Sequence, residues 1–128
     1  MSEAAAAPVV LVDALNVLRS TWPNIPAREL VALCGEWAGA EDCRAVVVFD
    51  GSAPADAGGD AVEPVSTGGE SADDWIAREA ARLRAAGSRF WLVTSDRELR
   101  ARAGRGAERT IGGGTFARAL LDLRDAPG

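Results

Sequence analysis

Carboxylates follow the most apolar segments of the chain. Asp13 comes after VVLV, Asp50 after VVVF and Asp96 after FWLVTS. Asp73 and Asp74 lie in GGESADDWIA, where a glycine-rich loop gives way to a helical pattern. Short apolar runs rich in β-branched residues are typical of buried parallel strands, whose carboxyl ends meet at one edge of a sheet. We therefore expect the aspartates to lie along that edge, at strand ends and at one helix start.

Histidine is absent from the 128 residues, and the two cysteines, Cys34 and Cys43, do not form a CxxC motif. This composition excludes Ser-His-Asp and Cys-His nucleophiles, histidine general bases and the common zinc patterns. Any catalysis must therefore use carboxylates, arginines, hydroxyl groups or a bound metal. Cys34 lies in an apolar helical pattern and is expected in the core.

A cluster of carboxylates would be electrostatically unfavourable. Two like charges about 4 Å apart repel by roughly 4 kcal/mol at an effective dielectric constant of 20. A hard divalent cation offsets this repulsion, and oxygen ligands without histidine or cysteine favour Mg²⁺ or Mn²⁺ over zinc. Such an ion lowers the pKa of a bound water and neutralises charge on a phosphoryl group during in-line displacement.

Most of these aspartates also have a structural explanation. The sequence SDRE predicts a helix capped by Ser95, with Asp96 in its first turn, where a negative charge is favoured. Asp50 precedes a glycine and is compatible with a turn. Asp13 is harder to explain in this way, because it directly ends a buried strand.

In the segment GGESADDWIA, different residues are expected to cap the helix and to join the carboxylate cluster. Ser71 is the expected helix cap, and Asp74 has the spacing of a capping-box acid. We therefore predict that Asp74 lies near the cap, while Asp73 faces Asp13 and Asp96 across the strand ends.

The elements that would position these side chains alternate along the chain. Apolar runs predict strands at 9–14, 44–51 and 89–96, and helical periodicity predicts helices at 27–39 and 71–86. A weaker strand at 61–67 contains Pro64 and is expected at the edge of the sheet. No hairpin signal separates the strong strands, so we predict an α/β protein with three α/β/α layers around a mostly parallel central sheet.

The domain organisation is simple. We expect a flexible N-terminus at 1–7, a single domain at 8–124 and a C-terminal tail at 125–128. The first seven residues carry an acid and no base, and no apolar run approaches the roughly 20 residues of a membrane span. The expectation is a soluble, cytoplasmic protein with no membrane partner. All 14 basic residues are arginine, which is typical of a GC-rich bacterial genome.

Five motifs together resemble a known family. VVLVDALNVL, AVVVFDG, ESADDWIAREA, WLVTSDRELR and GGGTFARAL occur in this order and cover most of residues 9–121. They resemble the NYN-type nuclease domains of the PIN-like superfamily, most closely the YacP-like branch. The resemblance implies a strand order of 3-2-1-4-5 and a metal-dependent endoribonuclease that hydrolyses RNA phosphodiester bonds with Mg²⁺ or Mn²⁺. RNA is the implied partner, with ribosome-associated mRNA and tRNA as candidate substrates.

The resemblance also implies roles for individual residues. Asp13, Asp73 and Asp96 match the acidic positions that bind the catalytic metal. Ala14 stands where the family usually has glycine, and the C-terminal part is shorter than in many YacP-like proteins. The remaining matches are Asn16 and Ser95 as site-ordering residues, and Asp50 and Asp74 as further candidate metal ligands.

The last third of the sequence is basic. Residues 78–109 contain nine arginines and four acids, although the whole chain has a net charge of −5. Arg97 and Arg100 directly follow Asp96 and are the best candidates for contacts with RNA phosphates. Trp22 lies in a loop soon after Asn16 and is a candidate for base stacking. The other three tryptophans, Trp37, Trp75 and Trp91, are expected in the core.

Two other functions remain open at this point. One is a non-catalytic RNA- or protein-binding module that retains the NYN fold. The other is a phosphatase of the haloacid-dehalogenase type, suggested by VVVFDG. That chemistry requires a second acid two residues after Asp50, where this sequence has Ser52.

Overall fold

The computed structural model describes residues 7–126 of the chain. Its centre is a parallel sheet of five strands in the order β3-β2-β1-β4-β5. This order confirms the predicted 3-2-1-4-5 topology. We call the edge where the strands begin the amino edge and the edge where they end the carboxyl edge. The strands are β1 (Val9–Asp13), β2 (Arg44–Phe49), β3 (Val62–Ser66), β4 (Phe90–Val93) and β5 (Arg109–Ile111).

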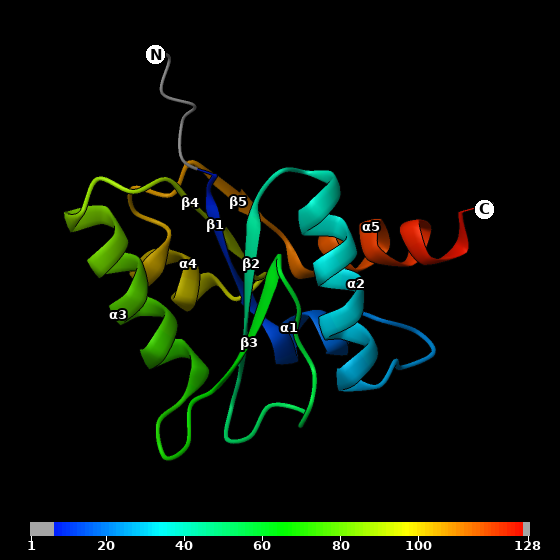
Figure 1. Cartoon of the computed structure of the whole chain (residues 1–128). Coiled ribbons are helices and arrows are strands. Elements are labelled where there is room, and N and C mark those ends of the chain that lie inside the picture. The colour runs from blue at the N-terminus through cyan, green and yellow to red at the C-terminus, as the bar shows by residue number, and fades with distance from the viewer. Residues whose placement is uncertain (1–6, 127–128) are drawn as a thin grey trace, which may run out of the picture.

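Helices cover both faces of the sheet, as predicted. One face carries α3 (Ala72–Ala85) and α4 (Arg97–Ala103). The other carries α1 (Ala14–Arg19), α2 (Ala27–Ala40) and α5 (Gly113–Asp125). Figure 1 shows the resulting three layers, with α3 and α4 on the left and the other helices on the right. Between residues 7 and 126, no helix is long and apolar enough to cross a membrane.

The central strands β1, β2 and β4 are mostly apolar because each contributes to two cores. In β1, Val10 and Val12 pack under α1, α2 and α5, whereas Leu11 packs under α3 and α4. Successive side chains of a strand point to opposite faces, so a sheet covered on both faces needs apolar residues at every position. Cys34 is fully buried in the first of these cores, which confirms its predicted location.

The tryptophans divide as the sequence predicts. Trp91 is buried, and Trp37 packs edge-on against it with 6.1 Å between ring centroids. Trp75 packs partly buried against the other core, and Trp22 is 86% exposed. Trp22 is therefore available for contacts with another molecule.

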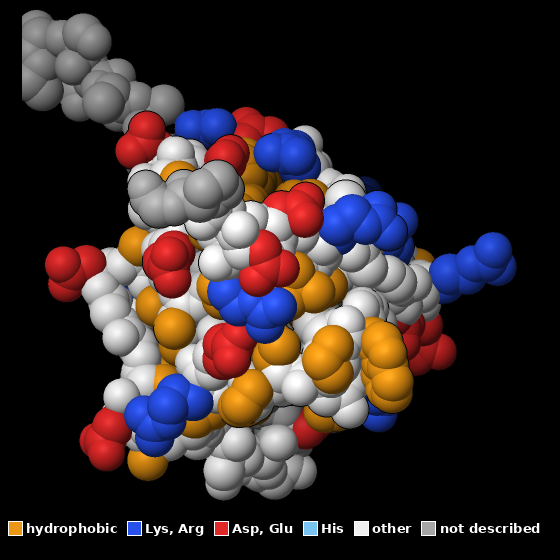
Figure 2. Space-filling view, turned by 90° about the vertical axis from the view of Figure 1, so that its right-hand side faces the viewer, with side chains coloured by type: hydrophobic (Ala, Val, Ile, Leu, Met, Phe, Trp, Pro, Cys, Tyr) orange, Lys and Arg blue, Asp and Glu red, His pale blue; other side chains and the backbone are white. Residues whose placement is uncertain are grey.

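The outer face formed by α2 and α5 carries side chains of every kind. Figure 2 shows acidic, basic and hydrophobic side chains interspersed on this side of the molecule. An ion pair of 3.1 Å between Arg124 and Glu29 joins α5 to α2.

Several predicted boundaries differ from the structure. The strand predicted at 89–96 ends at Val93, although the N–H of Thr94 still donates to the Ile111 carbonyl of β5 at 2.9 Å before the chain enters α4. The last helix includes Asp125, which the sequence analysis assigned to the C-terminal tail. The predicted flexible N-terminus lies outside the described residues except for Ala7, and the final two residues of the tail also lie outside them.

Candidate active site

A pocket of about 200 Å³ opens at the carboxyl edge of the sheet. Four aspartates from different elements line it: one from the end of β1, one after β2, one from the first turn of α3 and one after β4. We call this site the acidic pocket. Its lining residues are Asp13, Leu15, Asn16, Arg19, Asp50, Ser71, Asp73 and Asp96.

Asp13 forms the floor of the acidic pocket and is only 6% exposed. Val12 pairs with Val93 across the parallel strands, so Asp13 lies beside Thr94. The Thr94 hydroxyl donates to Asp13 Oδ2 at 2.9 Å and accepts from the backbone N–H of Asp96 at 3.1 Å. This buried hydroxyl therefore orients one carboxylate and holds the backbone of a second.

Burial and neighbouring carboxylates raise the pKa of two of the four aspartates, Asp13 and Asp73. Burial is the largest cause of the raised pKa of Asp13, and the nearby charges of Asp73 and Asp50 add to it, whereas the Thr94 hydrogen bond opposes it. The pKa of Asp73 is also raised, first by burial and then by Asp96 and Asp50. The charges of neighbouring pocket carboxylates therefore act on both Asp13 and Asp73.

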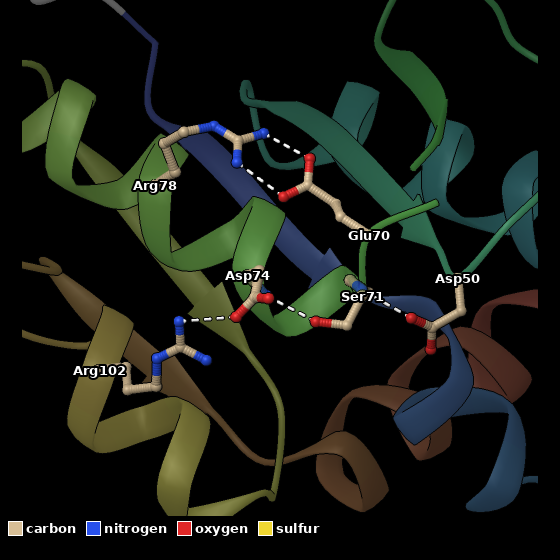
Figure 3. A network of polar contacts seen from close by, with 7 residues as sticks. Asp50, Glu70, Ser71, Asp74, Arg78 and Arg102 are labelled. Atoms are coloured by element: carbon tan, nitrogen blue, oxygen red, sulfur yellow. Dashed lines mark hydrogen bonds and ion pairs between the residues drawn. The ribbon is translucent and has the colours of Figure 1, made fainter. Parts of the chain in front are cut away.

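Asp73 and Asp74 point to different partners. Asp74 lies outside the acidic pocket and forms an ion pair of 2.9 Å with Arg102 of α4. Its backbone N–H donates to Ser71 Oγ at 3.1 Å, so Ser71 is the helix cap that the sequence predicts. Figure 3 shows both contacts at the start of α3. As expected, Asp74 lies near the helix cap, whereas Asp73 lines the acidic pocket.

Asp50 holds the start of α3 from the side of β2. Its Oδ1 accepts from the backbone N–H of Ala72 at 2.6 Å, a contact visible in Figure 3. Thr67 closes the same loop, because its hydroxyl accepts from Gly51 N–H and donates to the Phe49 carbonyl, both at 3.0 Å. These bonds tie the start of the loop after β2 to the segment that leads from β3 into α3.

Asn16 and Ser95 form a second wall of the site. Asn16 Oδ1 accepts from the Ser95 N–H at 2.9 Å, and Ser95 Oγ accepts from the Gly113 N–H at 2.8 Å. A Cβ atom at Gly113 would collide with Asn16 Oδ1, so a larger residue here would displace the Asn16 side chain. The predicted cap role of Ser95 is wrong: Asp96 caps α4, and its Oδ1 accepts from Leu99 N–H at 3.0 Å.

The predicted RNA-contacting residues lie outside the acidic pocket. Arg100 Nε donates to the Thr94 carbonyl at 2.8 Å, which holds this arginine against the turn that carries Asp96. Arg97 is exposed in the first turn of α4. Trp22 lies in the loop after α1, a few residues after Asn16 in the sequence. Their roles toward RNA remain predictions.

The donor set of the pocket can be compared with the needs of a metal ion. No group of three or more acidic or cysteine side chains within residues 7–126 is already placed to hold an ion. Mg²⁺ is commonly bound through one or two carboxylates, with waters and substrate oxygens completing its shell. The four carboxylates fit a hydrated hard cation of this kind, and the pocket offers no imidazole or thiolate for zinc.

Sequence reasoning missed two polar residues of the site. Thr94 becomes a neighbour of Asp13 only through the register between β1 and β4, for which the sequence carries no signal. Arg19 is the basic residue among those that line the acidic pocket. The sequence indicates this position only weakly, because whether Arg19 reaches the pocket depends on the direction in which the short helix after Asp13 runs.

The fold and the pocket define a class: a parallel α/β protein whose acidic site lies at the carboxyl ends of its strands. The family model of the YacP-like NYN domain matches residues 10–112. The chain belongs to this family, which is of the PIN-like nuclease type.

Solved structures agree with this assignment at the level of the fold. The crystal structure of Rae1 (YacP) from Bacillus subtilis has a TM-score of 0.70 and 22% sequence identity, over 91% of this chain and 75% of that one. A mutant of the same protein gives a TM-score of 0.66 and 23% identity, over 91% and 77% of the two chains. No protein with curated information matches the sequence significantly.

Proposed function

We propose that the protein is a divalent-metal-dependent endoribonuclease that hydrolyses RNA phosphodiester bonds in the acidic pocket. The observation that carries the proposal is the gathering of Asp13, Asp50, Asp73 and Asp96 in one pocket, where burial and like charges raise the pKa of two of them. Membership of a nuclease-type family supports the same conclusion.

The residues of the pocket would divide the work. Asp13, Asp73 and Asp96 would hold Mg²⁺ or Mn²⁺, which supplies polarisation of the phosphate and a water of lowered pKa. Thr94 would keep Asp13 in one orientation through its hydroxyl. Asn16 and Ser95 would fix the opposite wall.

Substrate contacts outside the pocket complete the proposal. Arg97 would contact RNA phosphates from the first turn of α4, and Arg100 would steady the turn at Thr94 beside them. Trp22 would stack on a base. We propose RNA in the cytoplasm as the substrate, with ribosome-associated mRNA and tRNA as candidates.

The test is cleavage of single-stranded RNA by the wild type and by an Asp13→Asn, Asp96→Asn double variant. Asparagine also caps helices well, so the double variant should fold. We expect the wild type to cleave RNA with Mg²⁺ or Mn²⁺ and to lose this activity in EDTA. Cleavage by the double variant should be at least about 100-fold slower, a larger loss than for substitutions of residues that only support the metal ligands. Glu63→Gln, at the amino edge, serves as the matched control and should cleave normally.

A second readout separates metal binding from activity. Mn²⁺ at about 100 times its dissociation constant should stabilise the wild type by about 2.7 kcal/mol, and the double variant much less. Cleavage that persists in EDTA or in the double variant contradicts the proposal. RNA binding without cleavage or Mn²⁺ stabilisation would support the non-catalytic RNA-binding module instead.

A further inference from the structure

An apolar hollow adjoins the acidic pocket. Its volume is about 350 Å³, and it shares two lining residues, Leu15 and Arg19, with the acidic pocket. The other residues that line it are Leu18, Asn24 and Ile25. The two concavities are therefore neighbours on either side of α1, with Arg19 belonging to both.

The sequence of α1 produces this arrangement. Ala14 and Val17 are buried beneath the helix, so Leu15 and Leu18, three positions apart, lie together on another side. The chain then turns back, and Ile25 closes the hollow from the loop between α1 and α2.

Two hydroxyls hold this loop at the end of the helix. Thr21 Oγ1 donates to the Leu18 carbonyl at 2.8 Å, and Ser20 Oγ donates to the Asn16 carbonyl at 3.0 Å. Thr21 is only 2% exposed. These hydrogen bonds hold the loop in place, so the apolar lining of the hollow is already formed.

Arg19 is placed where an anion could bind. It is exposed and forms no hydrogen bond or ion pair with any described residue, although four carboxylates line the same pocket. A guanidinium group can hold a phosphate through two parallel hydrogen bonds and can also lie flat against a base. An anionic group that bridges the two concavities would therefore find a cation between them.

We propose that the apolar hollow is a nucleobase subsite, and that Arg19 binds the phosphate linking this nucleotide to the one in the acidic pocket. This proposal rests on the proposed function and names the form of its substrate. The volume lies near the lower end of the roughly 300–1,000 Å³ of ligand pockets, which suits one ring system. Asn24 would present an amide to the edge of the base.

The proposed subsite selects for single-stranded RNA. A base in a duplex is stacked and paired, whereas a base in a single strand can enter an apolar hollow at little cost. Structured RNA should therefore bind only where a loop or an end exposes an unpaired base.

The experiment measures binding without cleavage, in EDTA, by fluorescence anisotropy of a labelled 12-nucleotide single-stranded RNA. A set of probes carries one abasic ribose at successive positions. We expect one abasic position to weaken wild-type binding by about tenfold, because the missing base would no longer bury apolar surface against Leu15, Leu18 and Ile25. The same abasic position should matter much less in Leu18→Ser, because the base would already have lost its apolar wall.

Arg19→Ala should weaken binding of the intact RNA by about tenfold, and Arg19→Lys should restore only part of it because lysine cannot form the paired contact. Arg105→Ala is the matched control, because Arg105 is exposed in the loop before β5 at the amino edge. Thermal unfolding would show whether Leu18→Ser is folded; Arg19→Ala, at an exposed position, tests the proposal independently.

The proposal is overturned if no abasic position weakens binding, if the loss is equal in the wild type and Leu18→Ser, or if Arg19→Ala behaves like Arg105→Ala. If RNA binding is unchanged in all variants, the hollow does not bind RNA, and the proposal is also overturned. Failure of the proposed function has a different signature: the binding pattern persists, but added Mg²⁺ or Mn²⁺ produces no cleavage.

Discussion

Carboxylates at the two edges of the sheet differ in their partners and in the direction in which their pKa values are shifted. At the amino edge, Glu63 pairs with Arg44 at 2.7 Å and Glu108 with Arg89 at 2.8 Å. Glu108 also accepts from Trp91 Nε1 at 2.8 Å. Hydrogen bonds from Arg89 and then from Trp91 lower the pKa of Glu108 to about 2.

At the carboxyl edge, the four aspartates of the acidic pocket form no ion pair with any described residue, in contrast to Asp74 beside them. The pKa values of Asp13 and Asp73 are raised by burial and by neighbouring carboxylates. A lowered pKa means that ionisation favours the fold, and a raised pKa means that ionisation opposes it. The amino edge therefore uses its charges for stability, whereas the carboxyl edge keeps unfavourable charges that a bound cation would relieve.

The largest effect should come from disturbing the wall of the carboxyl edge without touching a charge. Gly113→Ala forces a Cβ atom against Asn16 Oδ1, and overpacking of this kind costs about 1–3 kcal/mol. We expect RNA cleavage to fall about 10–100-fold, as for other residues that support a metal site. Gly114→Ala is the control, because a Cβ atom there meets nothing within 4 Å. Equal cleavage rates in the two variants would show that the wall has no role in the site.

The next effect is a gain of stability from removing a pocket charge. Asp13→Asn keeps an acceptor for Thr94 but loses the negative charge. Because the native pKa lies above the unfolded value of about 3.8, stability of the wild type is lost as pH rises through the native pKa. We expect the variant to be more stable than the wild type at pH 7 and therefore to have the higher melting temperature. The difference should shrink at pH 3, and a variant that melts lower than the wild type at pH 7 would contradict the comparison.

The smallest effect should appear at the amino edge and have the opposite sign. Glu108→Gln removes the ion pair with Arg89, so the melting temperature at pH 7 should fall slightly. The stability that Glu108 contributes is present above its ordinary pKa of 4.5 and is lost as pH falls through about 2. The deficit of the variant should therefore be smaller at pH 3. Glu36→Gln, at an exposed position of α2, is the control, and an equal deficit there would remove the contrast between the edges.

The arrangement of strands was predictable because two-sided burial leaves a strong signal in the sequence. Val10, Leu11 and Val12 are all buried, on alternating faces, so the run has no polar interruption. A parallel sheet then brings the residues after each run to one edge, which is why Asp13 and Asp96 were expected together. The topology itself came from the resemblance, because apolar runs do not reveal which strands are neighbours.

The parts of the site that escaped prediction depend on contacts between elements. Thr94 becomes a partner of Asp13 only through the register of β1 and β4. The ion pair between Asp74 and Arg102 requires α3 and α4 to lie side by side. Arg19 enters the pocket because α1 begins directly at the end of β1. Spacing along the chain contains none of these relations.

The loop after β2 suggests how this domain could be extended. Its first residues are tied to the segment that leads from β3 into α3, by Thr67 against Gly51 and by Asp50 against Ala72, so these contacts do not involve the residues further along the loop. The exposed residues around Asp56 and Gly58 could thus be lengthened, or could carry an inserted binding peptide, while Asp50 and Asp73 keep their places. The loop is therefore a site where this chain could be extended toward a new partner without altering the pocket.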